Sequence, residues 1–109
     1  KEILVVFQPH LFSRTRDFIE DFASALSKFD DVLLLDIYPA RETPIVGVDS
    51  NWLLSKIENK RKKLSQKHNL IKDIKNSSAK VVVMLGAGDI GVLVNEVTSE
   101  LLKALEYEA

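Results

Sequence analysis

The sequence predicts an α/β domain built around a parallel sheet, and three apolar runs support this prediction. Residues 3–7 and 81–85 contain no polar side chain and are rich in valine, which is typical of parallel strands buried on both faces. Residues 32–37 are apolar except for Asp36. Helical patterns separate these runs, so the order of elements indicates βαβ units with right-handed crossovers.

The first predicted unit joins a strand at residues 2–7 to a strand at residues 32–37 through one helix. Helical periodicity predicts that helix over residues 15–28, and the hydroxyl of Ser13 or Thr15 is suited to cap its start. Its apolar stripe consists of Phe18, Ile19, Phe22, Ala23 and Leu26.

Residues 38–49 form a long connection without helical periodicity. Its turn-forming residues are Pro39, Pro44 and Gly47. Loops of this length in a small domain are usually functional or mobile. Asp49 and Ser50 then offer a helix N-cap, and a short helix is expected over residues 51–59.

Four consecutive basic residues, 60–63, follow this helix. No aromatic side chain lies between Trp52 and Tyr107 to stack on bases, so we expect a solvated surface and no nucleic-acid partner. Residues 63–65 are compatible with a short edge strand, and His68 is expected to be exposed at the start of a helix.

The last third of the chain predicts a helix, a strand and a final helix. Leu70, Ile71 and Ile74 mark the first of these helices, which should end around residues 76–78. The strand is the run at residues 81–85. Apolar residues of the final helix recur at helical spacing in Ile90, Leu93, Val94, Val97, Leu101, Leu102 and Leu105.

Composition excludes several classes of protein. The chain has 109 residues, enough for one domain, and 15 basic against 16 acidic residues give no argument for binding nucleic acid or a membrane surface. No apolar run approaches the roughly 18–20 residues of a membrane span, and no signal peptide is visible, so a cytoplasmic location is expected. With no cysteine and only two histidines, we expect no metal site.

Lys1 leads almost directly into a strand, so we expect the chain to be part of a longer protein.

The loop after the first strand carries the main candidate site. Arginines at the start of a helix are unfavourable by about 0.3–1 kcal/mol each, and Arg14 and Arg16 stand where the helix is predicted to begin. An unfavourable placement of charge at a loop between a strand and a helix suggests a functional site. With His10, Ser13 and free backbone N–H groups, the two arginines predict an anion-binding pocket. The alternative is that Arg16 pairs with Glu20, four residues further on.

A second candidate is the glycine loop after residues 81–85. Gly86, Gly88 and Gly91 match the G-x-G-x-x-G pattern of dinucleotide sites. That fingerprint also needs a following strand that ends in an acidic residue, which this chain does not contain, so no NAD site is predicted. Two interpretations remain: binding of an anion by backbone N–H groups, or close packing of strand against helix. In a parallel sheet both candidate loops open on the same edge.

Six segments, taken together and in order, resemble a known family. They are VFQPH, SRTRD, LDIYPARE, PI, GVDS and GAGDI, at residues 6–10, 13–17, 35–42, 44–45, 47–50 and 86–90. This ordered set is similar to the C-terminal domain of the Mur ligases, and within them to the branch that adds L-alanine to UDP-N-acetylmuramate in peptidoglycan biosynthesis. The resemblance covers nearly the whole chain.

The resemblance implies a Rossmann-like domain with helices on both faces of its sheet, spanning residues 1–109 as the third domain of an ATP-dependent amide-forming ligase. The N-terminal domain would bind the UDP-sugar, and the central domain would hold ATP and Mg²⁺. No catalytic residue, metal or cofactor is expected in this fragment. The substrate-binding residues that it suggests are His10, Ser13, Arg14, Arg16, Gly86, Ala87, Gly88 and Asp89.

Two departures from the family pattern matter. Leu11 stands where many members have arginine, which removes one candidate carboxylate ligand. The phosphate-binding loop of the family is absent, so the fragment alone should be catalytically inactive. Two other interpretations stay open: a stand-alone α/β module that binds an anion or small molecule, and the related ligase that recycles murein tripeptide. The segment QPH at residues 8–10 favours the alanine enzyme.

Overall fold

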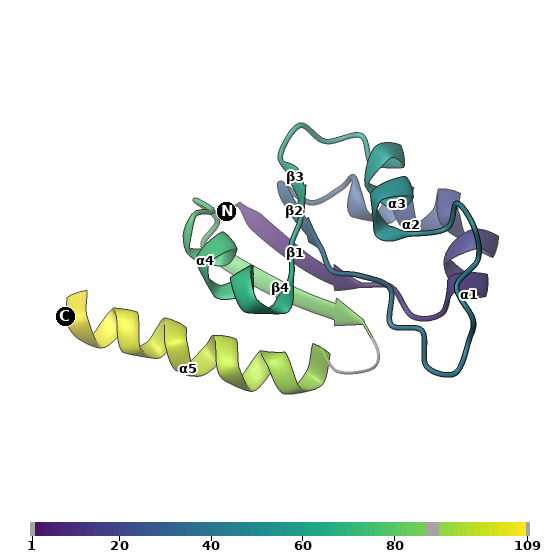
Figure 1. Ribbon diagram of the computed structural model, residues 1–109. Helices are drawn as coiled ribbons and strands as arrows, with labels where there is room; N and C mark the ends of the chain where they lie inside the picture. The colour runs from purple at the N-terminus through teal and green to yellow at the C-terminus, as the bar shows by residue number, and fades with distance from the viewer. Residues whose placement is uncertain (1, 87–89, 109) are drawn as a thin grey trace.

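The computed structural model of the chain describes residues 2–86 and 90–108, with side chains described as far as Lys103. Its centre is a parallel sheet of four strands in the order β3-β2-β1-β4, shown in Figure 1. The strands are β1 (Ile3–Gln8), β2 (Asp31–Leu34), β3 (Lys62–Leu64) and β4 (Val81–Gly86). This arrangement confirms the predicted parallel α/β sheet.

Helices cover both faces of the sheet. On one face, α2 (Ile19–Leu26) and α3 (Ser50–Lys56) pack on Val5, Val32 and Leu34. On the other face, α4 (Leu70–Lys75) and α5 (Ile90–Glu108) pack on a second set of strand residues. That set is Leu4, Val6, Leu33 and Leu35. Figure 1 shows α2 and α3 on the side of the sheet opposite α5. The Rossmann-like arrangement implied by the family resemblance is therefore confirmed.

The chain continues strand-like pairing beyond the ends of β1 and β2. The Leu35 N–H donates to the Phe7 carbonyl at 2.9 Å, and the Tyr38 N–H donates to the Pro9 carbonyl at 2.8 Å. An isolated parallel bridge joins His10 to Tyr38. The predicted strand at residues 32–37 is therefore only partly regular, although its end stays attached to the extension of β1.

The first helix differs most from its prediction. Instead of one helix over residues 15–28, the chain forms α1 (Phe12–Asp17) and then α2, with Phe18 between them at φ −116° and ψ 24°. The predicted hydroxyl N-cap is wrong as well. Leu11 occupies that position with φ 70°, and the Thr15 hydroxyl donates back to the Leu11 carbonyl at 2.8 Å. The Ser13 hydroxyl is bonded to a residue of another loop, a contact that local sequence does not show.

The other elements lie close to their predicted positions. Asp49 caps α3 and accepts the Trp52 N–H at 2.8 Å, as expected, although the helix ends at Lys56 and not at residue 59. The edge strand is present as β3, and exposed His68 lies in the short 3₁₀ turn η1 (Lys67–Asn69). Residues 38–49 form no helix. They pass along the end of the sheet where β1 and β2 terminate.

Candidate functional site

The carboxyl ends of the strands form the edge where a ligand is expected. The chain passes from β1 outward to β2 and β3, then crosses to place β4 on the other side of β1. The reversal lies between β1 and β4, where Gln8 pairs with Gly86. Ligands of open α/β sheets bind in the crevice at such a reversal. The strand extension through His10, the start of α1 and the loop at residues 38–49 all lie at this edge.

Gly86 is required by the close approach of β4 to β1. Its φ is +148°, and an added Cβ would lie 2.7 Å from the Gln8 carbonyl oxygen. A Cβ at Gly91 would meet no atom within 4 Å. The packing interpretation therefore holds for Gly86, but the contact is between two strands and not between strand and helix. Ala87, Gly88 and Asp89, the other members of the predicted turn, lie outside the described residues.

His10 is held against Tyr38 at the end of the sheet. The two rings stack with centroids 5.9 Å apart and an interplanar angle of 16°. The buried Nδ1 of His10 has no hydrogen-bond partner in the described part of the chain. His10 is thus fixed in position and keeps an unused polar atom.

Glu42 supplies an anion at the start of α1. The Ser13 N–H donates to Glu42 Oε1 at 3.1 Å, and the Ser13 hydroxyl donates to the other carboxylate oxygen. The hydroxyl bond, followed by the backbone bond, holds the pKa of Glu42 below its usual value. The anion expected at the helix start is therefore provided by the chain itself. Glu42 was not predicted as a site residue. The one feature of the sequence that could have pointed to it is its carboxylate in the loop at residues 38–49, which returns to the same sheet edge.

The two arginines occupy different environments from those expected. Because α1 ends at Asp17, Arg14 and Arg16 lie in its last turn, where a cation is favoured, and the premise of an unfavourable placement is wrong. Arg16 Nε pairs with Asp17 Oδ1 at 2.9 Å, which raises the pKa of Arg16. The alternative pair of Arg16 with Glu20 is absent from the described contacts, and Glu20 instead lies 3.6 Å from Lys56.

Like Arg41 in the loop at residues 38–49, Arg14 offers an exposed guanidinium at this edge. Its side chain is exposed and makes no hydrogen bond or ion pair with another residue in the described ranges. Leu11, three residues earlier, adopts a positive φ that non-glycine residues rarely adopt. Strained backbone of this kind clusters at functional sites, which supports a role for this turn.

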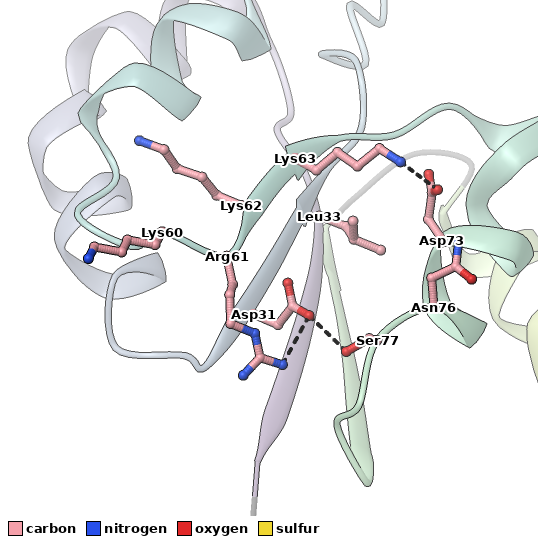
Figure 2. Close-up of a pocket in the computed structure, with 9 residues that line it drawn as sticks. All are labelled: Asp31, Leu33, Lys60, Arg61, Lys62, Lys63, Asp73, Asn76 and Ser77. Carbon is pink, nitrogen blue, oxygen red and sulfur yellow. Dashed lines mark hydrogen bonds and ion pairs between the residues drawn. The ribbon is translucent and has the colours of Figure 1, made fainter.

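A hollow lies at the amino ends of β2 and β3, away from the edge that carries His10 and Arg14 (Figure 2). Here Lys63 Nζ lies 2.9 Å from Asp73 Oδ1, and an Arg61 nitrogen lies 3.5 Å from Asp31. Arg61 also bonds Glu2 at 3.0 Å. Arg61 and Lys63 are exposed, as expected of a solvated surface, but each also forms an ion pair with a carboxylate. The charges of Arg61 and Lys63 point at carboxylates, and the Lys63–Asp73 pair joins β3 to α4.

No three His, Asp or Glu side chains in residues 2–86 and 90–103 gather in a way that would hold a metal ion. Within the described ranges, no helix is both long enough and apolar enough to cross a membrane.

The fold defines the chain as a Rossmann-like α/β domain, and comparison with known proteins identifies its family. No protein-family model matches the chain. It is 66% identical over 109 residues to a UDP-N-acetylmuramate–L-alanine ligase of Christiangramia forsetii, covering 100% of this chain and 23% of that protein. Ligases of the same name from Flavobacterium psychrophilum and Porphyromonas gingivalis are 60% and 54% identical, over 93% and 86% of this chain and 22% and 21% of theirs.

The chain belongs to the family of these ligases, the Mur ligases, which confirms the resemblance seen in its sequence motifs. It spans less than one quarter of the length of the relatives that it matches.

Proposed function

We propose that this chain is the C-terminal, substrate-binding domain of an ATP-dependent ligase that adds L-alanine to UDP-N-acetylmuramate in peptidoglycan biosynthesis. One observation carries the proposal: the chain is 66% identical over its whole length to a ligase of that name. The ligand edge at the end of the parallel sheet supports it, because the residues that resemble the family's substrate site lie there.

In this proposal, ATP phosphorylates the muramate carboxylate, and the amine of L-alanine then attacks the acyl phosphate. ATP and Mg²⁺ are held mainly by the central domain, and the UDP-sugar by the N-terminal domain. The residues described in this chain include no metal-ligand cluster that would replace them. The domain alone should therefore neither hydrolyse ATP nor form an amide bond. A cytoplasmic location is part of the proposal, because ATP is a cytoplasmic metabolite.

The role of this domain is to hold the incoming amino acid. Arg14 is suited to the L-alanine carboxylate because a guanidinium stays charged and binds a carboxylate through two parallel N–H bonds. We assign His10 to the same site. Ser13 and Arg16 border it, each engaged by an internal partner. Gly86, with Ala87, Gly88 and Asp89, is proposed to face the same cleft.

The experiment is Arg14→Ala in the full-length ligase, with the KM of each substrate measured separately. Losing a charge-assisted hydrogen bond costs about 1.5–3 kcal/mol, so the KM for L-alanine should rise roughly 10- to 150-fold while that for ATP changes far less. Arg16→Ala is the matched control, with a smaller expected effect because Asp17 already pairs with Arg16. If both KM values rise together, Arg14 acts through domain closure or phosphate binding. If neither moves, the assignment of Arg14 is wrong.

A further inference from the structure

Two buried polar atoms in the described part of the chain have no hydrogen-bond partner, and they lie close together in the sequence. They are Gln8 Oε1 and His10 Nδ1. The Gln8 side chain is the more enclosed, since only 4% of the residue is exposed. Buried polar groups are nearly always paired, so each exception needs an explanation.

The two unpaired atoms belong to one face of one strand. Strand-like pairing continues from β1 through His10, because the Leu11 N–H donates to the Tyr38 carbonyl at 2.9 Å and the Tyr38 N–H to the Pro9 carbonyl at 2.8 Å. Side chains two residues apart on a strand lie on the same face. Gln8 and His10 therefore point to the same side at the carboxyl end of β1, where a ligand is expected.

Gln8 also lines a cavity of about 270 Å³ at this edge. The other lining residues are Leu35, Asp36, Gln66, Lys67 and His68. Asp36 is exposed, and its carboxylate has no hydrogen bond or ion pair with any other residue in the described ranges. The cavity is slightly smaller than the roughly 300–1,000 Å³ typical of sites for larger ligands, which suits a ligand of few atoms.

The chemistry of the lining favours a ligand group that donates hydrogen bonds. The enclosed atom of the Gln8 amide is its acceptor, Oε1, and the carboxylate of Asp36 lies beside the cavity without a described partner. Lys67 also lines the cavity, but this cation is already engaged in another interaction. An amine has N–H groups for both. A neutral amide oxygen can orient an amine without favouring its protonated form as strongly as a carboxylate would, which leaves the nitrogen lone pair free to attack.

We propose that Gln8 binds the amine of the incoming amino acid, with Oε1 accepting one of its N–H groups. This inference rests on the proposed function and adds to it a second contact point: the carboxylate of the amino acid binds at Arg14, and its amine binds at the end of β1. Asp36 attracts the ammonium form as it enters, and the ammonium releases one proton to solvent before the neutral amine is bound by Gln8 and attacks. The unpaired Gln8 Oε1 is then the atom that accepts the hydrogen bond from the substrate amine.

The test is Gln8→Met in the full-length ligase, a substitution that keeps the length of the side chain and removes its amide. A neutral hydrogen bond contributes a free energy that corresponds to a roughly 2- to 13-fold effect, so the KM for L-alanine should rise by that factor, with the KM for ATP unchanged. Propionate has the carboxylate of alanine but no amine. As a competitor of L-alanine, propionate should have the same inhibition constant for Gln8→Met as for wild type. For Arg14→Ala the inhibition constant of propionate should be higher, because its carboxylate loses a binding partner.

The thermal midpoint separates binding from folding. Because the Gln8 amide makes no hydrogen bond with any described residue, Gln8→Met should unfold at the wild-type temperature or above it. The inference is overturned if the KM for L-alanine does not change, if the inhibition constant of propionate rises by the same factor, or if the midpoint falls. A wild-type enzyme that shows no ligation dependent on L-alanine would instead overturn the proposed function itself.

Discussion

Glu42 binds Ser13 through both of its carboxylate oxygens, across 29 residues of sequence. The contact fixes the loop at residues 38–49 to the first turn of α1. Because the same loop carries Tyr38, which stacks on His10, both ends of the loop segment 38–42 are attached to the chain after β1. The candidate site is therefore held by two separated contacts and not by the strand-to-helix turn alone.

The first prediction concerns the pH dependence of this contact. The pKa of Glu42 is lowered in the folded chain, so its contribution to stability is complete above the unfolded value of about 4.3 and is lost as pH falls through the folded value. Wild type should therefore resist urea more than Glu42→Gln at pH 7, and the difference should shrink at pH 3. Urea unfolding of the 109-residue chain, followed by circular dichroism at both pH values, measures this.

Asp21→Asn is the control for that experiment, because Asp21 is exposed on the neighbouring helix and no hydrogen bond or ion pair joins it to the described residues. Its effect should be small and nearly the same at both pH values. A Glu42→Gln difference that stays constant between pH 7 and pH 3 would show that the carboxylate charge does not stabilise the contact.

Local sequence was sufficient where the governing contacts are local. Asp49 was predicted as an N-cap because it precedes a helical pattern, and it accepts the Trp52 N–H three residues on. The continuous apolar runs identified β1 and β4, because strands covered on both faces have no polar side. The apolar stripe of the first helix matches α2, in which Ile19, Ala23 and Leu26 are buried.

Sequence reasoning failed where contacts join distant segments. The break at Phe18 leaves that side chain 51% exposed, although its spacing placed it on the buried stripe. The acidic partners of Arg61 are Glu2 and Asp31, which are 59 and 30 residues away. The unpaired Oε1 of Gln8 was equally hidden, since only the folded chain shows that none of the described residues bonds it.

The second prediction concerns the buried carboxylate between β3 and α4. Burial alone would raise the pKa of Asp73, but hydrogen bonds from Lys63 at 2.9 Å and Ser65 at 2.7 Å outweigh it and lower the pKa. Ser65→Ala removes one donor from a buried charge and should lower the free energy of unfolding by about 1–3 kcal/mol. Urea denaturation of the 109-residue chain measures the loss.

Lys63→Met should cost less than Ser65→Ala, because the Lys63 side chain is 63% exposed and solvent screens its charge. Lys75→Met on the exposed side of α4 is the control and should stay within about 0.5 kcal/mol of wild type. The account of Asp73 is contradicted if the lysine substitution proves the more damaging of the two.

The third prediction compares two glycines of the same sequence motif. At Gly86 the backbone has φ +148°, a region that side chains rarely adopt, and an added Cβ would lie 2.7 Å from the Gln8 carbonyl oxygen. Gly86→Ala should therefore lower the free energy of unfolding by at least about 1–3 kcal/mol, the cost of one strained residue, and the contact with backbone adds to it. Urea unfolding of the 109-residue chain tests this.

Gly91→Ala is the matched comparison, because it makes the same chemical change five positions later. A Cβ there meets no atom within 4 Å, and the residue lies in α5, so the substitution should raise stability by about 0.4–1 kcal/mol through the restricted unfolded chain. The two substitutions should thus act in opposite directions. If both destabilise the chain equally, the glycines serve a shared role in the motif, and the close approach of β4 to β1 is not what requires Gly86. If Gly86→Ala is neutral, β4 can move away from Gln8 at little cost, and the crevice between β1 and β4 is not rigidly set.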